Sequence, residues 1–201
     1  MLPARSRTRA AFALYGLLSA LFCWPLFEFP NGLGVTDWDL HLFYYGSLLK
    51  NVGEYGQMPF WNPWYCGGNV LWQNPQIAVL SPVYPLASVV SLALAMKINI
   101  VLHYWLGFIG MHLLLTRIVK LSYGALVVYL SSIFVLAGGL ALHLNAGHSV
   151  FLPAFYIPVL LFLFLRGVET RSLRTRTAVS ELTIFRRTSG SNTATTSDRW
   201  P

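Results

Sequence analysis

The sequence predicts an all-α, polytopic membrane protein with about four transmembrane helices, a re-entrant or interfacial helix and a large first extracytoplasmic loop. Three observations predict this fold class. Of the 201 residues, 55% are hydrophobic and only 10% are charged, whereas a soluble domain carries about 25% charged residues. The apolar residues form long runs with basic residues near their ends, which is the pattern of membrane spans. One long polar and aromatic segment, residues 36–75, separates two of these runs.

The net charge of +7 does not indicate a nucleic-acid partner. Of the 14 basic residues, three lie in the first ten positions, six lie beyond Gly167 and the others are scattered singly. Positive-inside topology explains this distribution better than nucleic-acid binding, for which no motif is present. The chain also lacks a Walker A loop, a dinucleotide fingerprint and a nucleophile elbow. Its two cysteines, Cys23 and Cys66, have no metal-ligand spacing.

The chain begins with a basic cytoplasmic leader, residues 1–10, and a first predicted span, residues 11–29. A secretory signal peptide has the same order of charge and apolarity. However, the region where its cleavage site would fall contains Trp24, Pro25 and phenylalanines instead of small residues. The pattern therefore predicts an uncleaved span with the amino terminus inside.

The first outer loop is predicted to comprise residues 30–75. Its first part, residues 36–50, has the pattern of a helix, because Thr36 and Asp39 stand at the spacing of a capping box. The rest of the loop is dense in Gly, Pro and Asn, which predicts irregular structure.

The next segment, residues 76–96, is apolar but contains Pro82 and Pro85. If it crossed the membrane, Arg117 and Arg166 would both face outside, against the positive-inside tendency. We therefore expect an interfacial or re-entrant helix here. Three spans are predicted after it, at residues 99–116, 121–143 and 150–165.

This topology places His143 and His148 on the same outer side as Asp37 and Asp39. The composition then changes at Gly167 to a segment rich in Arg, Thr and Ser. Such a composition predicts a disordered basic tail over residues 167–201. Two explanations stay open, a cytoplasmic tail and a shifted or truncated reading frame.

The strongest local pattern for chemistry is Asp37-Trp38-Asp39-Leu40-His41. On a helix Asp37, His41 and Tyr44 would share one face. A carboxylate just outside a span can act as general base on a hydroxyl, or hold a divalent cation between phosphates. Alternatively, Asp37 and Asp39 cap the helix and complement its dipole. Both are candidate catalytic residues and metal ligands, and the cofactor is either none or a divalent cation, Mg or Mn.

Several other residues are candidates for substrate binding. The aromatic faces around Trp61–Trp64 can stack on a sugar or pack on a lipid chain, or they form an aromatic belt at the headgroups. Lys97 and His148 are candidates for contact with a lipid phosphate, with solvated side chains as the alternative. The candidate binding residues are His41, Trp61, Asn62, Trp64, Trp72, Lys97 and His148. For His103 and His112, inside a predicted span, we expect hydrogen bonds between helices.

The order of these segments resembles the amino-terminal part of YfhO-like bacterial membrane proteins and, more broadly, the GT-C class of integral-membrane glycosyltransferases. The resemblance covers roughly residues 10–166. It is carried by the early acidic residues Asp37 and Asp39, the block PFWNPWYCGGNVLWQNPQ, the segment SPVYPL and the spans containing GMHLLLTR and LNAGHSVFLPAFYIPVLLFLFLR. The most specific part is the W-N-P…G-G…N-P-Q order from Trp61 to Gln76. Proteins of this class continue with more spans than the four expected here.

The resemblance implies transfer of a sugar from a polyprenyl-phosphate donor to an acceptor on the outer face. An acidic residue of the first outer loop serves as base or metal ligand in this class, and by that match the role falls on Asp37 or Asp39. It implies membrane lipid and a polyprenyl-phosphate-linked sugar as partners, without nucleic acid, and a multi-pass location in the bacterial inner membrane. Two alternatives stay open, a non-catalytic protein that binds or transports a glycolipid and an inactive truncated fragment.

Overall fold

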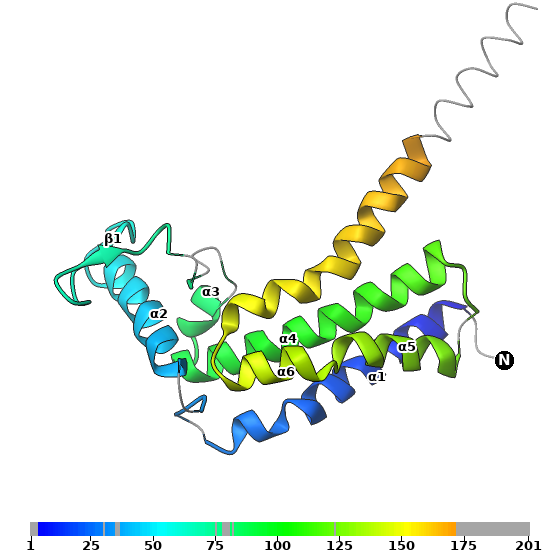
Figure 1. The fold of residues 1–201 in the computed structure, drawn as a ribbon, viewed down its shortest axis with the longest axis horizontal. Helices are drawn as coiled ribbons and strands as arrows, with labels where there is room; N and C mark the ends of the chain where they lie inside the picture. The colour runs from blue at the N-terminus through cyan, green and yellow to red at the C-terminus, as the bar shows by residue number, and fades with distance from the viewer. Residues whose placement is uncertain are drawn as a thin grey trace, which may run out of the picture. The chain divides into compact units, whose positions relative to one another are not determined.

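The computed structural model describes residues 4–29, 31–34, 37–74, 76–77, 81, 83–122 and 124–171, and these residues are mostly helical (Figure 1). The chain divides into two compact units, Met1–Leu160 and Leu161–Pro201. The elements are α1 (Ala4–Phe22), η1 (Trp24–Phe27), α2 (Trp38–Gly53), β1 (Trp61–Asn62), β2 (Asn69–Val70), α3 (Val83–Ala87), α4 (Leu92–Leu113), η2 (Leu114–Ile118), α5 (Ala125–Val135), α6 (Gly138–Asn145), η3 (Ser149–Tyr156) and a helix over residues 157–171.

Among the described residues, three helical segments are long and apolar enough to cross a membrane. They are Leu92–Ile118, Ala125–Asn145 and Ser149–Arg171. Each overlaps one of the three later spans that the sequence predicts, so the expectation of a helical protein with several apolar, span-length helices is met. The four-span count is not reached on this criterion, because α1 is not among the three.

The structure moves two of the predicted boundaries. Helix α1 begins at Ala4, within the predicted leader, and ends at Phe22, because a 3-10 turn containing Pro25 follows it. The predicted interfacial helix of residues 76–96 is divided into α3 and the first turn of α4. The division lies at Ser91, whose side chain accepts a hydrogen bond from the Leu94 amide at 3.3 Å, and such a side-chain cap marks a new helix start.

Helix α4 is the centre of the first unit and packs against α1, α2, α3, α5 and η3. Two glycines allow the closest approaches. A Cβ at Gly110 would lie 2.8 Å from the backbone nitrogen of Val159, and a Cβ at Gly107 would lie 2.7 Å from Phe155. Small residues of this kind permit close helix contact within a membrane.

Polar side chains link α4 to α1. The hydroxyl of Tyr15 lies 2.9 Å from Nδ1 of His112, and the indole of Trp105 donates to the carbonyl oxygen of Phe12 at 2.9 Å. The contact at His112 agrees with the expected helix–helix hydrogen bonding. His103 differs, because its Nδ1 bonds the carbonyl oxygen of Asn99 on its own helix at 2.7 Å.

The last described helix continues beyond Gly167, where the sequence predicts the disordered tail to begin. It extends to Arg171. An ion pair between Arg166 and Glu169 at 2.7 Å stabilises this end. The rest of the predicted tail, residues 172–201, lies outside the described residues.

Candidate functional site

The amino-terminal end of α2 presents the two candidate carboxylates. Asp37 is the residue before the helix, and its side chain makes no capping hydrogen bond. Its carbonyl oxygen instead accepts the amide of His41 at 3.1 Å. The alternative that the Asp37 side chain caps the helix is therefore not supported. The predicted capping box pairs Thr36 with Asp39, and Thr36 lies outside the described residues. Asp39 is exposed in the first turn, where its charge complements the helix dipole.

The turn after α6 brings two histidines to Asp37. Nε2 of His148 lies 3.4 Å from Oδ2 of Asp37, and Nδ1 of His143 lies 3.0 Å from Nδ1 of His148. Within the turn the amide of His148 donates to the carbonyl oxygen of His143 at 2.9 Å. The structure brings both histidines close to Asp37, and the three side chains form a continuous chain. That they face the outer side of a membrane stays a prediction.

Gly147 is what allows this approach. Its φ is +89°, a conformation that favours glycine, and a Cβ there would lie 2.8 Å from the backbone nitrogen of Trp38 and 2.9 Å from the carbonyl carbon of Asp37. The turn therefore packs directly on the start of α2.

The imidazole of His41 is buried, next to this chain but not part of it. Its Nδ1 lies 3.0 Å from the carbonyl oxygen of Gln76 and 3.3 Å from the hydroxyl of Ser149. A carbonyl accepts only, so Nδ1 carries the proton. This tautomer prevents Nδ1 from acting as a base on Ser149. Burial lowers the pKa of His41, and the Gln76 carbonyl and the nearby charge of Asp37 partly offset the effect.

Tyr44, which the sequence places on the same helix face, is buried like His41. The side chain of Asp37 is half exposed. Of the three residues predicted to share one helix face, His41 and Tyr44 are therefore buried and only Asp37 is half exposed. Sequence reasoning placed His41 at the substrate, but the structure uses it to hold the segment around Gln76.

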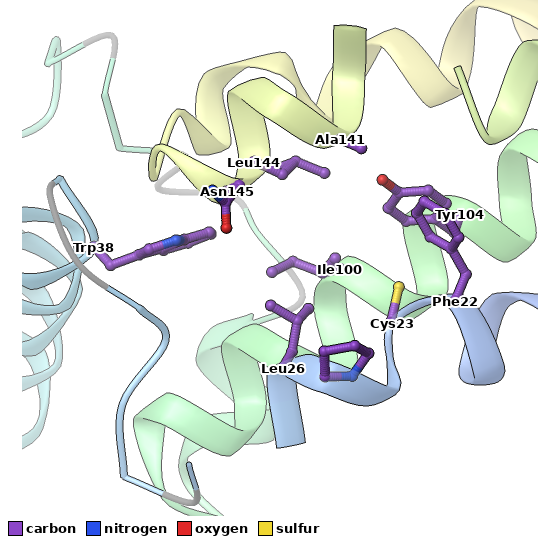
Figure 2. A pocket seen from close by; sticks show the side chains of 10 residues that line it. Phe22, Cys23, Leu26, Trp38, Ile100, Tyr104, Ala141, Leu144 and Asn145 are labelled. Carbon is purple, nitrogen blue, oxygen red and sulfur yellow. The ribbon is translucent and has the colours of Figure 1, made fainter. Parts of the chain in front are cut away.

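A cavity of about 140 Å³ lies between the start of α2 and the end of α6. In Figure 2 the indole of Trp38 and the ring of Tyr104 lie at opposite ends of its lining, and Leu144 and Asn145 come from the end of α6. The lining is mostly apolar and consists of Phe22, Cys23, Pro25, Leu26, Trp38, Ile100, Tyr104, Ala141, Leu144 and Asn145. Trp38 is 1% exposed, and its Nε1 has no hydrogen-bond partner.

Sequence reasoning missed this cavity and the contribution of His143. The lining residues come from five segments that are far apart in the chain: α1, η1, α2, α4 and α6. No local sequence motif therefore predicts the cavity. For His143 a signal was present, because two histidines flank the Asn145-Ala146-Gly147 turn.

Lys97 is fully buried. Its ammonium donates to the carbonyl oxygen of Phe29 and lies 5.9 Å from the centre of the Phe27 ring. The structure therefore uses Lys97 to fix the segment after α1 against α4. The sequence left open contact with a lipid phosphate or a solvated side chain for Lys97, and its burial fits neither arrangement.

The aromatic residues of the loop are arranged around a hairpin instead of the irregular loop expected. Strands β1 and β2 are antiparallel, with Trp61 opposite Val70. Asn62 is fully buried, and its side chain accepts the amide of Trp64 at 3.1 Å, so it stabilises the turn. Trp61, Trp64 and Trp72 are all partly or largely exposed.

The exposed tryptophans do not line the cavity beside Asp37. Trp64 stacks near Tyr55, with ring centres 6.1 Å apart, and Lys50 lies 5.3 Å from its ring. Trp72 packs near Phe60 at 5.6 Å. These exposed rings could stack on a sugar or lie at the lipid headgroups. Both the substrate-binding and the aromatic-belt interpretation of this loop therefore stay open.

A tentative metal role for Asp37 and Asp39 gains no support. Within the described ranges, no group of three or more His, Cys, Asp or Glu side chains could hold a metal ion. Because Nε2 of His148 faces Asp37 while its Nδ1 faces His143, the three side chains do not converge on one point.

Comparisons with known proteins do not identify the chain. No protein-family model, curated protein or solved structure gives a significant match.

Proposed function

We propose that this chain is the amino-terminal part of a membrane glycosyltransferase that moves a sugar from a polyprenyl-phosphate donor to an acceptor on the outer face. In this proposal Asp37 receives the proton of the acceptor hydroxyl. The contact between Asp37 and His148, 3.4 Å apart, carries the proposal. The same observation favours Asp37 over Asp39, a choice that the sequence left open.

The membrane arrangement proposed with this function has four crossings. Helix α1 would be the first, with the amino terminus in the cytoplasm of a bacterium, and the three apolar helices would follow. Residues 30–75 would then form the outer loop and α3 would lie at the membrane surface. The interior polar contacts of Tyr15 with His112 support α1 as a membrane helix, because polar groups at that depth require partners.

The proposed chemistry needs a carboxylate that is held but still accessible. Nε2–H of His148 orients Asp37, and the aspartate side chain stays half exposed. As the acceptor oxygen bonds the anomeric carbon of the sugar, its proton passes to Asp37 and the polyprenyl phosphate leaves. General-base help of this kind contributes about 10²–10⁴-fold. No step is assigned to a metal, because the described residues provide no three-ligand group.

A second function, glycolipid binding or transport without catalysis, is favoured by the apolar lining of the cavity beside Trp38. A lipid chain would contact Leu26, Ile100 and Leu144 there. In that case Asp37 would serve only to pair with His148. An inactive truncated fragment is the remaining alternative.

The test is a sugar-transfer assay in proteoliposomes that contain a polyprenyl-phosphate sugar, with Asp37→Asn and the matched control Asp39→Asn. We expect Asp37→Asn to lower transfer by about 10²-fold or more and Asp39→Asn to stay near wild type. Donor binding without transfer in every protein, including wild type, would support the glycolipid-binding function instead. Absence of both would support the inactive fragment.

A further inference from the structure

The proton positions along the Asp37–His148–His143 chain follow from the carboxylate at its end. Nε2 of His148 faces the carboxylate of Asp37 at the 3.4 Å distance of an ion pair. A negative carboxylate attracts an N–H and repels a nitrogen lone pair, so this contact favours the tautomer of His148 with the proton on Nε2. In neutral His148, Nδ1 then has only a lone pair. The contact between the two Nδ1 atoms at 3.0 Å therefore requires His143 to donate. This leaves Nε2 of neutral His143 unprotonated.

The surroundings favour this arrangement. The ring of His143 stacks on Phe151, with centres 4.1 Å apart and planes at 22°, which fixes its plane. Its side chain is exposed, so it can meet a solute. His41 also interacts electrostatically with Asp37 and His148. Its Gln76 contact holds it as an Nδ1–H tautomer.

We propose that His143 is the entry point of a two-histidine proton relay that ends at Asp37. The acceptor hydroxyl gives its proton to Nε2 of His143. Nδ1–H of His143 passes its proton to Nδ1 of His148, and Nε2–H of His148 passes its proton to Asp37. Both imidazoles end neutral with exchanged tautomers, and the carboxylate ends protonated, so charge and protons balance.

The relay gives one common role to the two imidazoles beside the half-exposed Asp37. Without them the acceptor hydroxyl must reach the carboxylate itself, beside the Gly147 turn that packs on the start of α2. With them the reacting hydroxyl stays at the exposed ring of His143. The inference rests on the proposed function only for the identity of the proton donor.

The variant that separates relay from positioning is His143→Asn. An Asn side-chain amide placed near the former Nδ1 position can still donate to His148, but it cannot accept and pass on a proton. We expect this variant to keep the Nε2–H tautomer of His148 and to lower transfer by about 10²-fold.

The tautomers are measured directly by nitrogen-15 spectra of histidine-labelled protein in nanodiscs, without substrate. We expect Nδ1–H at His143, Nε2–H at His148 and a scalar coupling between the two Nδ1 nitrogens. An Nε2–H tautomer of neutral His143, or unchanged transfer in His143→Asn, would overturn the relay. If the spectra show these tautomers but wild type transfers no sugar, the proton arrangement of the chain stands and the proposed function fails.

Discussion

Replacing Gly147 by alanine should separate His148 from Asp37. The added Cβ would lie 2.8 Å from the backbone nitrogen of Trp38, whereas ordinary contact begins at 3.4 Å. The turn must therefore move by about 0.6 Å, because the atoms in its way belong to the backbone and cannot rotate aside. Movement away from α2 would lengthen the 3.4 Å contact between Asp37 and His148 toward about 4 Å and weaken the ion pair.

The cost of this substitution has two parts. An alanine at φ +89° costs roughly 1–2 kcal/mol in a left-handed conformation, and overpacking adds roughly 1–3 kcal/mol. Reduced freedom of the unfolded chain offsets about 0.4–1 kcal/mol. We therefore expect Gly147→Ala to destabilise the protein by roughly 1–4.5 kcal/mol.

The matched control is Gly139→Ala on the neighbouring helix α6. A Cβ at Gly139 meets nothing within 4 Å, so alanine there should stabilise the helix by about 0.5–1 kcal/mol. Apparent unfolding temperatures in detergent, followed by near-ultraviolet circular dichroism, compare the two variants. Histidine nitrogen-15 spectra then report whether His148 still donates to Asp37. Equal stability of both variants with wild type would refute the packing argument.

Two further predictions follow from other parts of the fold. Gly110→Leu should lower the unfolding temperature in the same assay, because even a Cβ there would lie 2.8 Å from the backbone nitrogen of Val159. The control is Gly138→Leu, since a Cβ at Gly138 meets nothing within 4 Å. Equal unfolding temperatures of the two variants would contradict the close approach at Gly110. His41→Asn should weaken the acid sensitivity of stability. Burial lowers the folded-state pKa of His41 from its ordinary 6.5, so protons favour the unfolded state, and stability is lost as pH falls from about 6.5 toward the folded pKa. Asn keeps a donor for Gln76 and does not titrate, so the same slope between pH 7 and 5 in both proteins would refute this assignment.

Hydropathy predicted the long apolar helices because membrane spans depend on the summed composition of many residues. It did not predict where α4 begins, because that depends on the single cap at Ser91. The same limit applies to α1, which ends before the turn containing Pro25. Helix boundaries depend on one or two side chains, and a composition average does not detect them.

The sequence predicts which site residues share a side of the membrane, because that depends only on the number of crossings between them. The parity of the crossings places His148 on the side of Asp37, and the structure brings them to 3.4 Å. The position of Lys97 was not predictable in this way. Its ammonium stays buried because the Phe29 carbonyl accepts from it, a partner that lies 68 positions away in the sequence.

The chain of Asp37, His148 and His143 depends on several helix ends at once. Lys97 of α4 holds the carbonyl oxygen of Phe29 after α1, and that segment leads into the start of α2. The turn at Gly147 packs on the same start of α2 from the end of α6. A peptide of residues 30–75 alone would therefore carry Asp37 without its histidines. It follows that the site forms only when α1, α2, α4 and α6 pack together, so variants at their contacts should change the histidine tautomers even where no site residue is altered.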